Sequence, residues 1–303
     1  MDNNQIQGFS IDALVPKDMA AKAEDIGVAK VNIGPLRMFA LAVLAGAFIA
    51  LGAIFATTVT TGAAALPFGV GKLLGGLVFC LGLILVVGAG AELFTGNNLI
   101  VMAWASGKIS TGRLLRNWVI VYLGNFVGAI FTVLLLFASK QYTFAGGAIG
   151  VNALNIASGK VQLDFLQAVA LGVLCNALVC LAVWLAIGAR SATDKILAII
   201  FPITGFVAAG FEHSVANMYF IPIGLLIKGG APAGFWNAAG VTAADYGSLT
   251  WGHFFLSNLL PVTIGNIIGG ALMVGLVYWF IYLRPAWIGN QRPGEDLGPA
   301  VGD

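Results

Sequence analysis

Two apolar runs in this chain are too long for one ordinary membrane crossing, and a polar cluster interrupts each of them. A helix needs about 20 apolar residues to cross the hydrocarbon core of a bilayer. The runs cover about 71–105 and 196–227, with the clusters AELFTGNN at 91–98 and GFEHSVANM at 210–218. Irregular backbone at membrane depth must line a cavity or lie buried in protein. Each run therefore predicts a broken membrane-spanning helix.

Four further apolar runs have the length of single crossings. Hydrophobic residues make up 59% of the 303-residue chain and charged residues only 9%, which excludes an ordinary soluble domain. We predict an all-α integral membrane protein with six crossings, the second and fifth broken, in a channel domain at 36–284. The four unbroken runs lie at about 36–60, 115–138, 164–188 and 254–283.

The two ends of the chain are polar. The N-terminal segment 1–35 has no hydrophobic stretch of a signal peptide. Within it, PKDMAAKAEDIGVAK at 16–30 alternates small apolar residues with charges and predicts an amphipathic surface helix. The tail at 285–303 is rich in Gly and Pro, which predicts a flexible segment.

Basic residues predict which side of the membrane each loop faces. With six crossings, one side carries both termini and the loops 106–116 and 189–195, and it holds eleven of the fifteen Lys and Arg residues. Positively charged loops stay in the cytoplasm, so both termini are predicted to be cytoplasmic. The net charge of only +2 gives no basic surface for a nucleic acid.

An internal repeat relates the two halves of the chain. The third and sixth spans share the pattern N-x6-GN-xx-G, which begins at Asn117 and at Asn258. The first and fourth spans add a weaker match, Ala45-Gly46 with Leu171-Gly172. An odd number of spans in each copy forces the second copy to enter the membrane inverted. Inverted repeats with paired broken helices are typical of transporters and channels, with the path at the repeat interface.

The broken spans also correspond, and their polar residues predict distinct roles. Glu92 stands five residues before Asn97, and Glu212 stands five residues before Asn217. We interpret all four as structural, with the glutamates accepting hydrogen bonds from backbone freed by the breaks. Helix ends near Gly96 and Ser214 would leave partial positive charge for a small anion. Thr95 and Ser214 suit helix capping, and the Thr95 hydroxyl is also free in this interpretation to meet a substrate.

His213 is the one histidine within a predicted span. An imidazole can hydrogen-bond a passing anion or hand it a proton, although a satisfied histidine between helices is the alternative. An intramembrane enzyme or sensor using Glu212 and His213 is the alternative from another class. No nucleophile motif, HExxH pair or nucleotide loop accompanies them, so we predict no enzyme, metal or cofactor. The cysteines Cys80, Cys175 and Cys180 lie in apolar runs and are predicted to be buried single thiols.

Apolar side chains flank both breaks. Rings of such residues can form constrictions that exclude hydrated ions, and packing in the protein core is the alternative role. The candidates are Phe79, Leu83, Leu93, Val179 and Phe206.

Four stretches together resemble the formate/nitrite transporter family: AELFTGNN, GFEHSVANM, PFGVGKLLGG at 67–76 and LPVTIGN at 260–266. The resemblance covers about residues 16–284. It implies an aquaporin-like fold without the aquaporin NPA motifs, and a homopentamer in the bacterial inner membrane with one pore in each protomer. The implied function is passage of formate and related small monovalent weak-acid anions. Nitrite or hydrosulfide as the preferred substrate is the alternative within the family.

The resemblance also implies roles for particular residues. It puts the family's central histidine at His213 and the threonine of a flexible loop at Thr95. It implies Lys160 in a vestibule and Asn176 and Asn266 on the pore wall. It implies that the N-terminal helix is a lid that moves with pH, where a membrane-surface anchor is the alternative. The implied constrictions are Phe79 and Phe206 toward the periplasm, and Leu83, Leu93 and Val179 toward the cytoplasm. The loop here ends Gly96-Asn97-Asn98, a departure from some relatives that leaves its mobility open.

Overall fold

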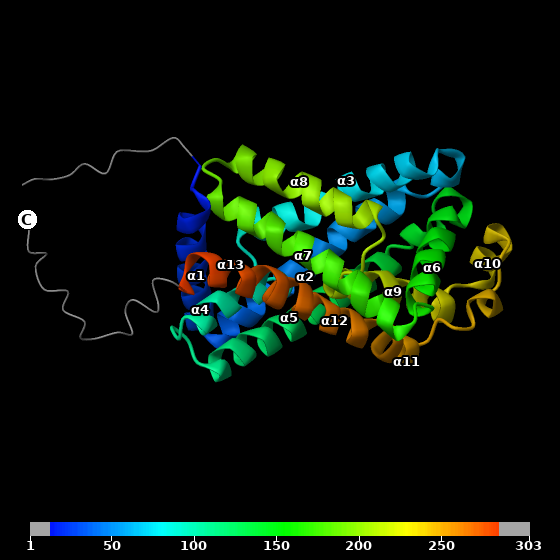
Figure 1. The fold of residues 1–303 in the computed structure, drawn as a ribbon. Coiled ribbons are helices and arrows are strands. Elements are labelled where there is room, and N and C mark those ends of the chain that lie inside the picture. Colours follow the sequence, from blue (N-terminus) through cyan, green and yellow to red (C-terminus); the bar gives the residue numbers. More distant parts are fainter. Residues whose placement is uncertain (1–12, 285–303) are drawn as a thin grey trace, which may run out of the picture.

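The computed structural model describes residues 13–284, and every regular element within them is a helix. The predicted flexible tail at 285–303 lies outside the described residues. The long helices run in one common direction, with α1, α4 and α13 at one end of the molecule and α6, α10 and α11 at the other (Figure 1). The first and last described helices therefore share one end, as an even number of crossings requires.

Five helical runs among the described residues are long and apolar enough to cross a membrane, and the count reaches six if the bent pair α9 and α10 forms one span. The five are α2 (Pro35–Val59), α3 (Phe68–Ala89), α5 (Thr111–Ala138), α7 (Phe165–Gly188) and the run Ala243–Tyr282. That last run contains η5 (Ala243–Tyr246), α11 (Trp251–His253), the π-helix η6 (Phe254–Leu259), α12 (Leu260–Ile267), the π-helix η7 (Ile268–Leu276) and α13 (Val277–Tyr282).

Both predicted breaks are present, and each begins with a glycine in the left-handed region. α3 is followed by Gly90 at φ 78°, and α8 (Ala192–Ala208) is followed by Gly210 at φ 76°. Glycine takes this conformation without the steric cost that a Cβ brings, so it ends a helix sharply. Two broken helices are therefore built into the sequence.

The segments after the breaks differ. α9 (Ser214–Gly230) is a 17-residue helix, longer than the sequence indicated, and α10 (Ala233–Ala239) follows it at a sharp bend. After the first break, the 3₁₀ turn η2 (Gly96–Ile100) leads into the five-residue helix α4 (Val101–Ala105). A short helix therefore begins at Gly96 as predicted, and its first turn is 3₁₀.

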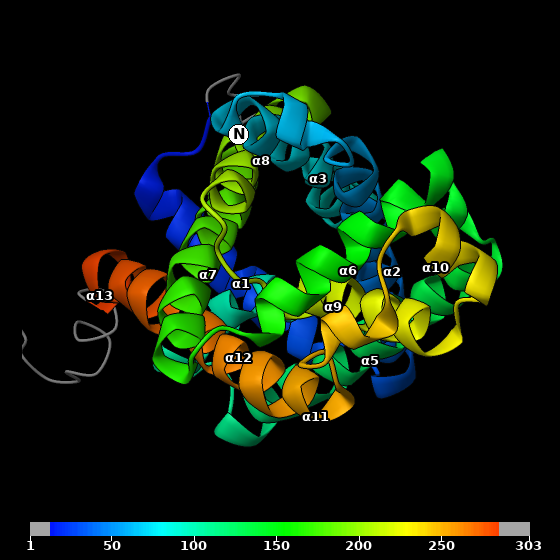
Figure 2. The same cartoon turned by 90° about the vertical axis from the view of Figure 1, so that its right-hand side faces the viewer.

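The packing of the helices follows the inverted repeat. α2 packs against α5 and α3, as α7 packs against α12 and α8, and α3 and α8 meet between the two halves (Figure 2). The N–H of Glu92 donates to the carbonyl of Leu41, and the N–H of Glu212 donates to the carbonyl of Leu171. Leu41 thus corresponds to Leu171. The predicted match of Ala45-Gly46 with Leu171-Gly172 was wrong by one helical turn.

Two glycines of the N-x6-GN-xx-G pattern allow this close packing. A Cβ on Gly128 would lie 1.9 Å from the carbonyl oxygen of Val43, and a Cβ on Gly269 would lie 2.1 Å from that of Val173. Small residues let membrane helices approach until their backbones touch. The pattern therefore records helix contact in both halves.

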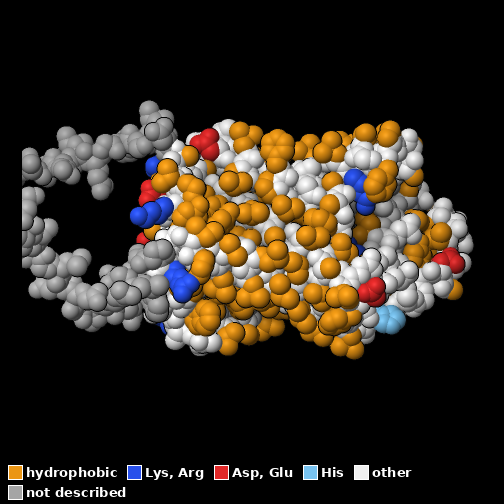
Figure 3. Space-filling view, viewed as in Figure 1, with side chains coloured by type: hydrophobic (Ala, Val, Ile, Leu, Met, Phe, Trp, Pro, Cys, Tyr) orange, Lys and Arg blue, Asp and Glu red, His pale blue; other side chains and the backbone are white. Residues whose placement is uncertain are grey.

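Two short surface helices complete the repeat. The segment predicted as an amphipathic helix forms α1 (Pro16–Asn32), and its counterpart α6 (Ala148–Val161) was not expected from the sequence. Hydrophobic side chains cover the middle of the molecular surface, while charged side chains gather toward its two ends (Figure 3). This distribution fits a multi-pass membrane protein. Three further short 3₁₀ helices lie between the longer helices of the described residues: η1 (Ala63–Ala65), η3 (Gln141–Thr143) and η4 (Ala145–Gly147).

Candidate functional site

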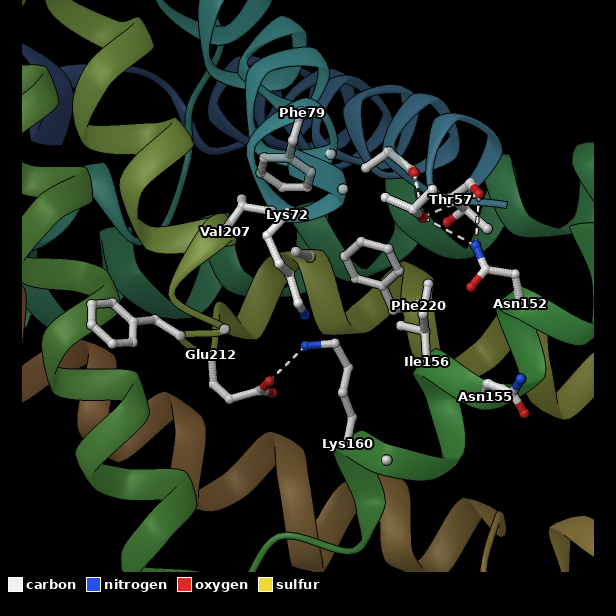
Figure 4. Close-up of a pocket in the computed structure, with 18 of the residues that line it drawn as sticks. Thr57, Lys72, Phe79, Asn152, Asn155, Ile156, Lys160, Val207, Glu212 and Phe220 are labelled. Atoms are coloured by element: carbon white, nitrogen blue, oxygen red, sulfur yellow. Dashed lines mark hydrogen bonds and ion pairs between the residues drawn. The ribbon is translucent and has the colours of Figure 1, made fainter. Parts of the chain in front are cut away.

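A buried ion pair anchors the second break. The ammonium of Lys160 on α6 lies 2.6 Å from Glu212 Oε1 (Figure 4). The other carboxylate oxygen accepts hydrogen bonds from Asn217 at 2.7 Å and from Asn258 at 3.1 Å. Asn217 also donates to Asn258 Oδ1 at 2.7 Å. One carboxylate thus joins α6, α9 and the last span.

The first break carries the same arrangement. Lys30 on α1 lies 2.6 Å from Glu92 Oε1 and donates to Asn97 Oδ1 at 2.9 Å. Asn97 donates to Glu92 Oε2 at 2.7 Å and to Asn117 Oδ1 at 3.0 Å. The sequence analysis missed Lys30. A signal was available, because Lys30 stands as far before Leu41 as Lys160 stands before Leu171.

Glu92 and Glu212 were predicted to accept hydrogen bonds from backbone freed by the breaks, and this was wrong. Their carboxylates accept hydrogen bonds from lysine and asparagine side chains instead. Two other asparagines hold the backbone at the breaks. Asn125 donates to the carbonyls of Ala42 and Glu92 and accepts from the N–H of Phe94. Its counterpart Asn266 donates to the carbonyls of Gly172 and Glu212 and accepts from the N–H of Ser214. Fully bonded backbone is what a break at membrane depth requires.

His213 and Thr95 bring the two breaks together. His213 Nε2 lies 2.9 Å from the Thr95 hydroxyl oxygen, and both residues are buried. The N–H of Ala216 donates to His213 Nδ1 at 3.0 Å, so Nδ1 carries no proton in this arrangement. We therefore assign the ring proton to Nε2, which donates to the Thr95 oxygen. The Thr95 hydroxyl keeps its own proton available for a further acceptor.

The cap of α9 is His213 itself, through the bond from Ala216. The prediction that Thr95 and Ser214 act as side-chain caps was wrong: Thr95 makes no such cap bond. The buried Ser214 hydroxyl has no hydrogen-bond partner among the described residues. The His213 ring also stacks on Phe206, with ring centroids 5.9 Å apart.

Two cavities approach this pair from opposite ends of the molecule. The larger, about 590 Å³, opens among the ends of α2, α3 and α6, and the smaller, about 300 Å³, opens beside α1. Each contains the ion pair of its own break. The larger cavity is lined by Lys72, Phe79, Lys160, Phe206, Glu212 and His213, and the smaller by Lys30, Leu83, Glu92, Leu93, Gly96 and Asn97, among others.

Apolar side chains separate the two cavities. Phe79 and Phe206 meet edge to face with centroids 5.7 Å apart and border the larger cavity. Leu83, one turn after Phe79 on α3, borders the smaller cavity together with Leu93. Val179 is buried and borders neither cavity. Four of the five predicted constriction residues thus line one of the two cavities.

The predicted pore-wall asparagines border neither cavity. Asn266 holds the second break, as described above. Asn176 donates to the carbonyl of Thr95 at 3.3 Å, to Asn98 Oδ1 at 3.2 Å and to the carbonyl of Asn266 at 2.6 Å. Both residues thus bind backbone carbonyls of the two breaks, and Thr95 itself also borders neither cavity. The three cysteines are free and buried, as predicted.

Comparison with known proteins agrees with this arrangement. Residues 17–280 match the profile of the formate/nitrite transporter family. The chain is 50% identical to the formate channel FocA of Escherichia coli K12 over 273 residues, which is 90% of this chain and 96% of FocA. It is 43% identical to FocA of Haemophilus influenzae, over 89% of this chain and 95% of that protein.

A solved structure leads to the same assignment. The structure described as a pentameric formate channel with formate bound superposes with a TM-score of 0.79 at 51% identity, covering 82% of this chain and 98% of the other. Such identity over nearly the whole length of each protein goes well beyond a shared fold. The chain belongs to the formate/nitrite transporter family.

Proposed function

We propose that this protein passes formate and related small monovalent weak-acid anions across the bacterial inner membrane. One observation carries the proposal: the buried Thr95–His213 contact lies between two cavities that each hold a lysine–glutamate pair. The formate channels among its relatives support the choice of substrate. The function is passage of a solute and not catalysis of a reaction.

The apolar boundary between the cavities sets the energetic problem. A bare anion there would lose its hydration and pay a large desolvation cost. Lysine ammonium groups attract the anion into the cavities. Transient protonation of the anion then removes most of the cost at Phe79, Phe206, Leu83 and Leu93. Flux would consequently depend on pH.

His213 and Thr95 act on the solute by hydrogen bonding in this mechanism. The Nε2–H of His213 donates to the Thr95 oxygen, and the Thr95 hydroxyl donates to the anion. Direct proton donation by His213 would need a second ring proton on Nδ1, where the Ala216 N–H already donates. We therefore propose that the proton reaches the anion through water, while the imidazole and hydroxyl stabilise both forms of the solute.

Formate flux in protein-only liposomes tests this mechanism. His213→Phe removes the Nε2–H that donates to the Thr95 oxygen, and it is expected to lower formate uptake at both acidic and neutral pH. Wild-type uptake at both pH values in that variant would overturn the role of His213. Anion-driven swelling or current in liposomes holding no other protein would also rule out the enzyme and sensor alternatives.

Nitrite and hydrosulfide remain candidate substrates because they are also small weak-acid anions. We propose that formate is preferred. Competition of each anion against labelled formate in the same liposomes decides the ranking. Stronger competition by nitrite or hydrosulfide than by unlabelled formate would reverse it.

We also propose a homopentamer with one pore in each protomer and cytoplasmic termini. Exposed leucine and phenylalanine side chains on the spans offer surface for lipid and for neighbouring copies. A pentameric relative supports the stoichiometry, and the excess of basic residues on one side supports the orientation. Mass measurement of the intact assembly and labelling of single cysteines in intact cells test these two statements.

The position of α1 beside the smaller cavity suggests that this helix is a lid. Lys22, Ile26 and Lys30 of α1 line the smaller cavity. We propose that α1 closes this cavity in a pH-dependent way. Deleting residues 1–30 is a poor test, because it also leaves the buried Glu92 carboxylate without Lys30. Replacing Gly27 by Leu is a more specific test. A Cβ at this position would lie only 3.2 Å from Ala103, so a leucine side chain would push α1 away from the helix it packs against. Flux that keeps the wild-type pH dependence after this change would count against the lid.

A further inference from the structure

Among the positions where the two halves of the inverted repeat differ, four carry buried polar residues that are linked to one another. Counting from Glu92 and Glu212, Leu93 corresponds to His213, Thr95 to Val215 and Asn98 to Met218. Counting from Leu41 and Leu171, Gly46 corresponds to Asn176. The polar members of these pairs are Thr95, Asn98, Asn176 and His213. None has a polar counterpart in the other half.

Hydrogen bonds join these four residues in a chain. Asn98 Nδ2 donates to the carbonyl of Phe94 at 2.9 Å, and Asn98 Oδ1 accepts from Asn176 at 3.2 Å. Asn176 also donates to the carbonyl of Thr95 at 3.3 Å, and the Thr95 hydroxyl meets His213. Asn98 thus binds the Phe94 carbonyl directly. It also holds the Asn176 amide, which binds the Thr95 carbonyl.

All of these contacts are buried. Asn98, Asn176 and Thr95 each have 0% exposed surface. No regular α-helix holds the segment between Gly90 and Val101, so side-chain bonds fix its path. A buried amide gives up water for these bonds, and losing a partner leaves it unpaired at a cost. The loop is therefore held by specific groups and not by its own backbone alone.

We propose that Asn98 is a positioning residue that, together with Asn176, holds the 90–98 loop so that the Thr95 hydroxyl faces His213. The two amides hold the backbone carbonyls of Phe94 and Thr95. The Thr95 hydroxyl lies 2.9 Å from the His213 imidazole. Asn98 itself borders neither cavity, so it acts on the solute through Thr95. The inference rests on the proposed function for its effect on flux, but not for its effect on the loop.

Gly270 supports the pair from the opposite side. A Cβ on Gly270 would lie 2.3 Å from Asn176 Nδ2 and 2.9 Å from Asn98 Cβ. The first distance is shorter than any real contact allows. Gly270→Ala therefore displaces the Asn176 amide without removing a polar group. Its Cβ would also lie 2.8 Å from Cys180 Sγ, so this variant is assessed by the pH profile of formate uptake and not by labelling of Cys180.

Cys180 reports the loop position without any transport measurement. Its thiol is fully buried and lies 3.3 Å from the Thr95 carbonyl oxygen. Val183, one turn later on α7, lines the smaller cavity and faces Gly96. If the loop leaves this position, the thiol becomes reachable from that cavity. Replacing Cys80 and Cys175 by Ala makes Cys180 the single target for a small methanethiosulfonate reagent.

The test compares Asn98→Leu with Met218→Leu, its equally buried counterpart in the second half. Labelling of Cys180 in reconstituted full-length protein should be about tenfold faster in the Asn98 variant, because two hydrogen bonds are lost, and unchanged in the Met218 variant. Formate uptake by the Asn98 variant should also have an altered pH profile. Gly270→Ala should alter the pH profile in the same way, and it replaces Asn98→Leu if that protein does not fold.

Each outcome bears on the proposal. Labelling of the Asn98 variant as slow as wild type, or a wild-type pH profile in the Gly270 variant, would overturn it. Faster labelling with the wild-type pH profile would also overturn it, since Thr95 would then not depend on the loop. If wild-type protein passes no formate while the labelling difference is present, the proposed function fails and the loop assignment stands.

Discussion

The Thr95 hydroxyl and His213 Nε2 are 2.9 Å apart although 118 residues separate them in the chain. Thr95 belongs to the first helix break and His213 to the second. Their contact is thus one of the places where the two inverted halves meet through polar groups. The ion pairs, the asparagines that hold the breaks and the close-packing glycines repeat in both halves, whereas this contact occurs once among the described residues.

The hydrogen bond from Ala216 predicts the tautomer of His213. We expect the neutral ring to carry its proton on Nε2, because Nδ1 accepts a backbone N–H. Nitrogen NMR spectra of histidine-labelled protein in lipid should show this tautomer, with His253→Gln used to assign the signals. A dominant Nδ1–H tautomer would contradict the hydrogen bond from Ala216 that caps α9. It would also contradict the proposed donation from His213 Nε2 to the Thr95 oxygen.

The two ion pairs should differ in their contribution to stability. The side chain of Lys160 is 17% exposed and that of Lys30 is 26% exposed, while their carboxylate partners are almost fully buried. Glu212→Gln leaves the better-buried ammonium unpaired and should lower the free energy of unfolding by about 2 kcal/mol. Glu92→Gln should cost less. Denaturation in detergent measures the free energy of unfolding of both variants. If the double variant Lys160→Gln/Glu212→Gln loses less of this free energy than the two single variants lose together, the ion pair is the cause.

Gly128 and Gly269 should tolerate no side chain. Alanine at either position would push a Cβ into a backbone carbonyl, so we expect little or no folded protein on size-exclusion chromatography. Gly205→Ala is the matched control. It lies in α8 with nothing within 4 Å of its Cβ position, and alanine favours a helix by up to about 1 kcal/mol. A folded Gly128→Ala protein with wild-type stability would show that the spans can separate.

Docking of α1 should weaken at alkaline pH. Lys108 in the loop after α4 lies 2.6 Å from Glu24 of α1, and the hydrogen bond to this carboxylate raises the pKa of Lys108 above its usual value. Because the pKa of Lys108 is raised in the folded protein, its ion pair with Glu24 stabilises the docked helix fully below the ordinary lysine pKa of about 10.4. This stabilisation is lost as the pH rises through the raised pKa. A spin label at Ala21→Cys should therefore become more mobile only in that alkaline range.

Lys108→Met serves as the control for this experiment. It should make the label on α1 more mobile already at neutral pH, with no further change on raising the pH. A label equally immobile in both proteins would show that Lys108 does not hold the helix.

Local sequence was sufficient to predict the breaks. The polar clusters at 91–98 and 210–218, with Glu and Asn at the same spacing inside apolar runs, predicted where the helices break. The shared pattern beginning at Asn117 and Asn258 predicted the repeat. These features are local in sequence, since helix ends depend on conformational freedom and on side chains close by.

Partners were harder to predict because they depend on tertiary contacts. Lys30 reaches Glu92 across 62 residues, and the short helix that presents it had been considered only as a surface element. Helix α6, the sequence AIGVNALNIASGKV, is too short and too polar for a span, so it was not expected. Asn266 had been expected on the pore wall, yet its amide binds the carbonyl of Gly172 on another helix. No periodicity within the last span reports that distant acceptor.

The unequal pair at the centre gives the pathway a direction. A solute from the larger cavity meets His213 at the cavity wall, whereas one from the smaller cavity first passes Leu93 and Gly96. Passive flow still stops when the electrochemical potentials on the two sides are equal. The concentration that half-saturates flow, however, need not be the same for inward and outward movement. Two identical halves would make the two directions equivalent, so the sequence differences at Thr95 and His213 are what allow uptake and release to differ in their kinetics.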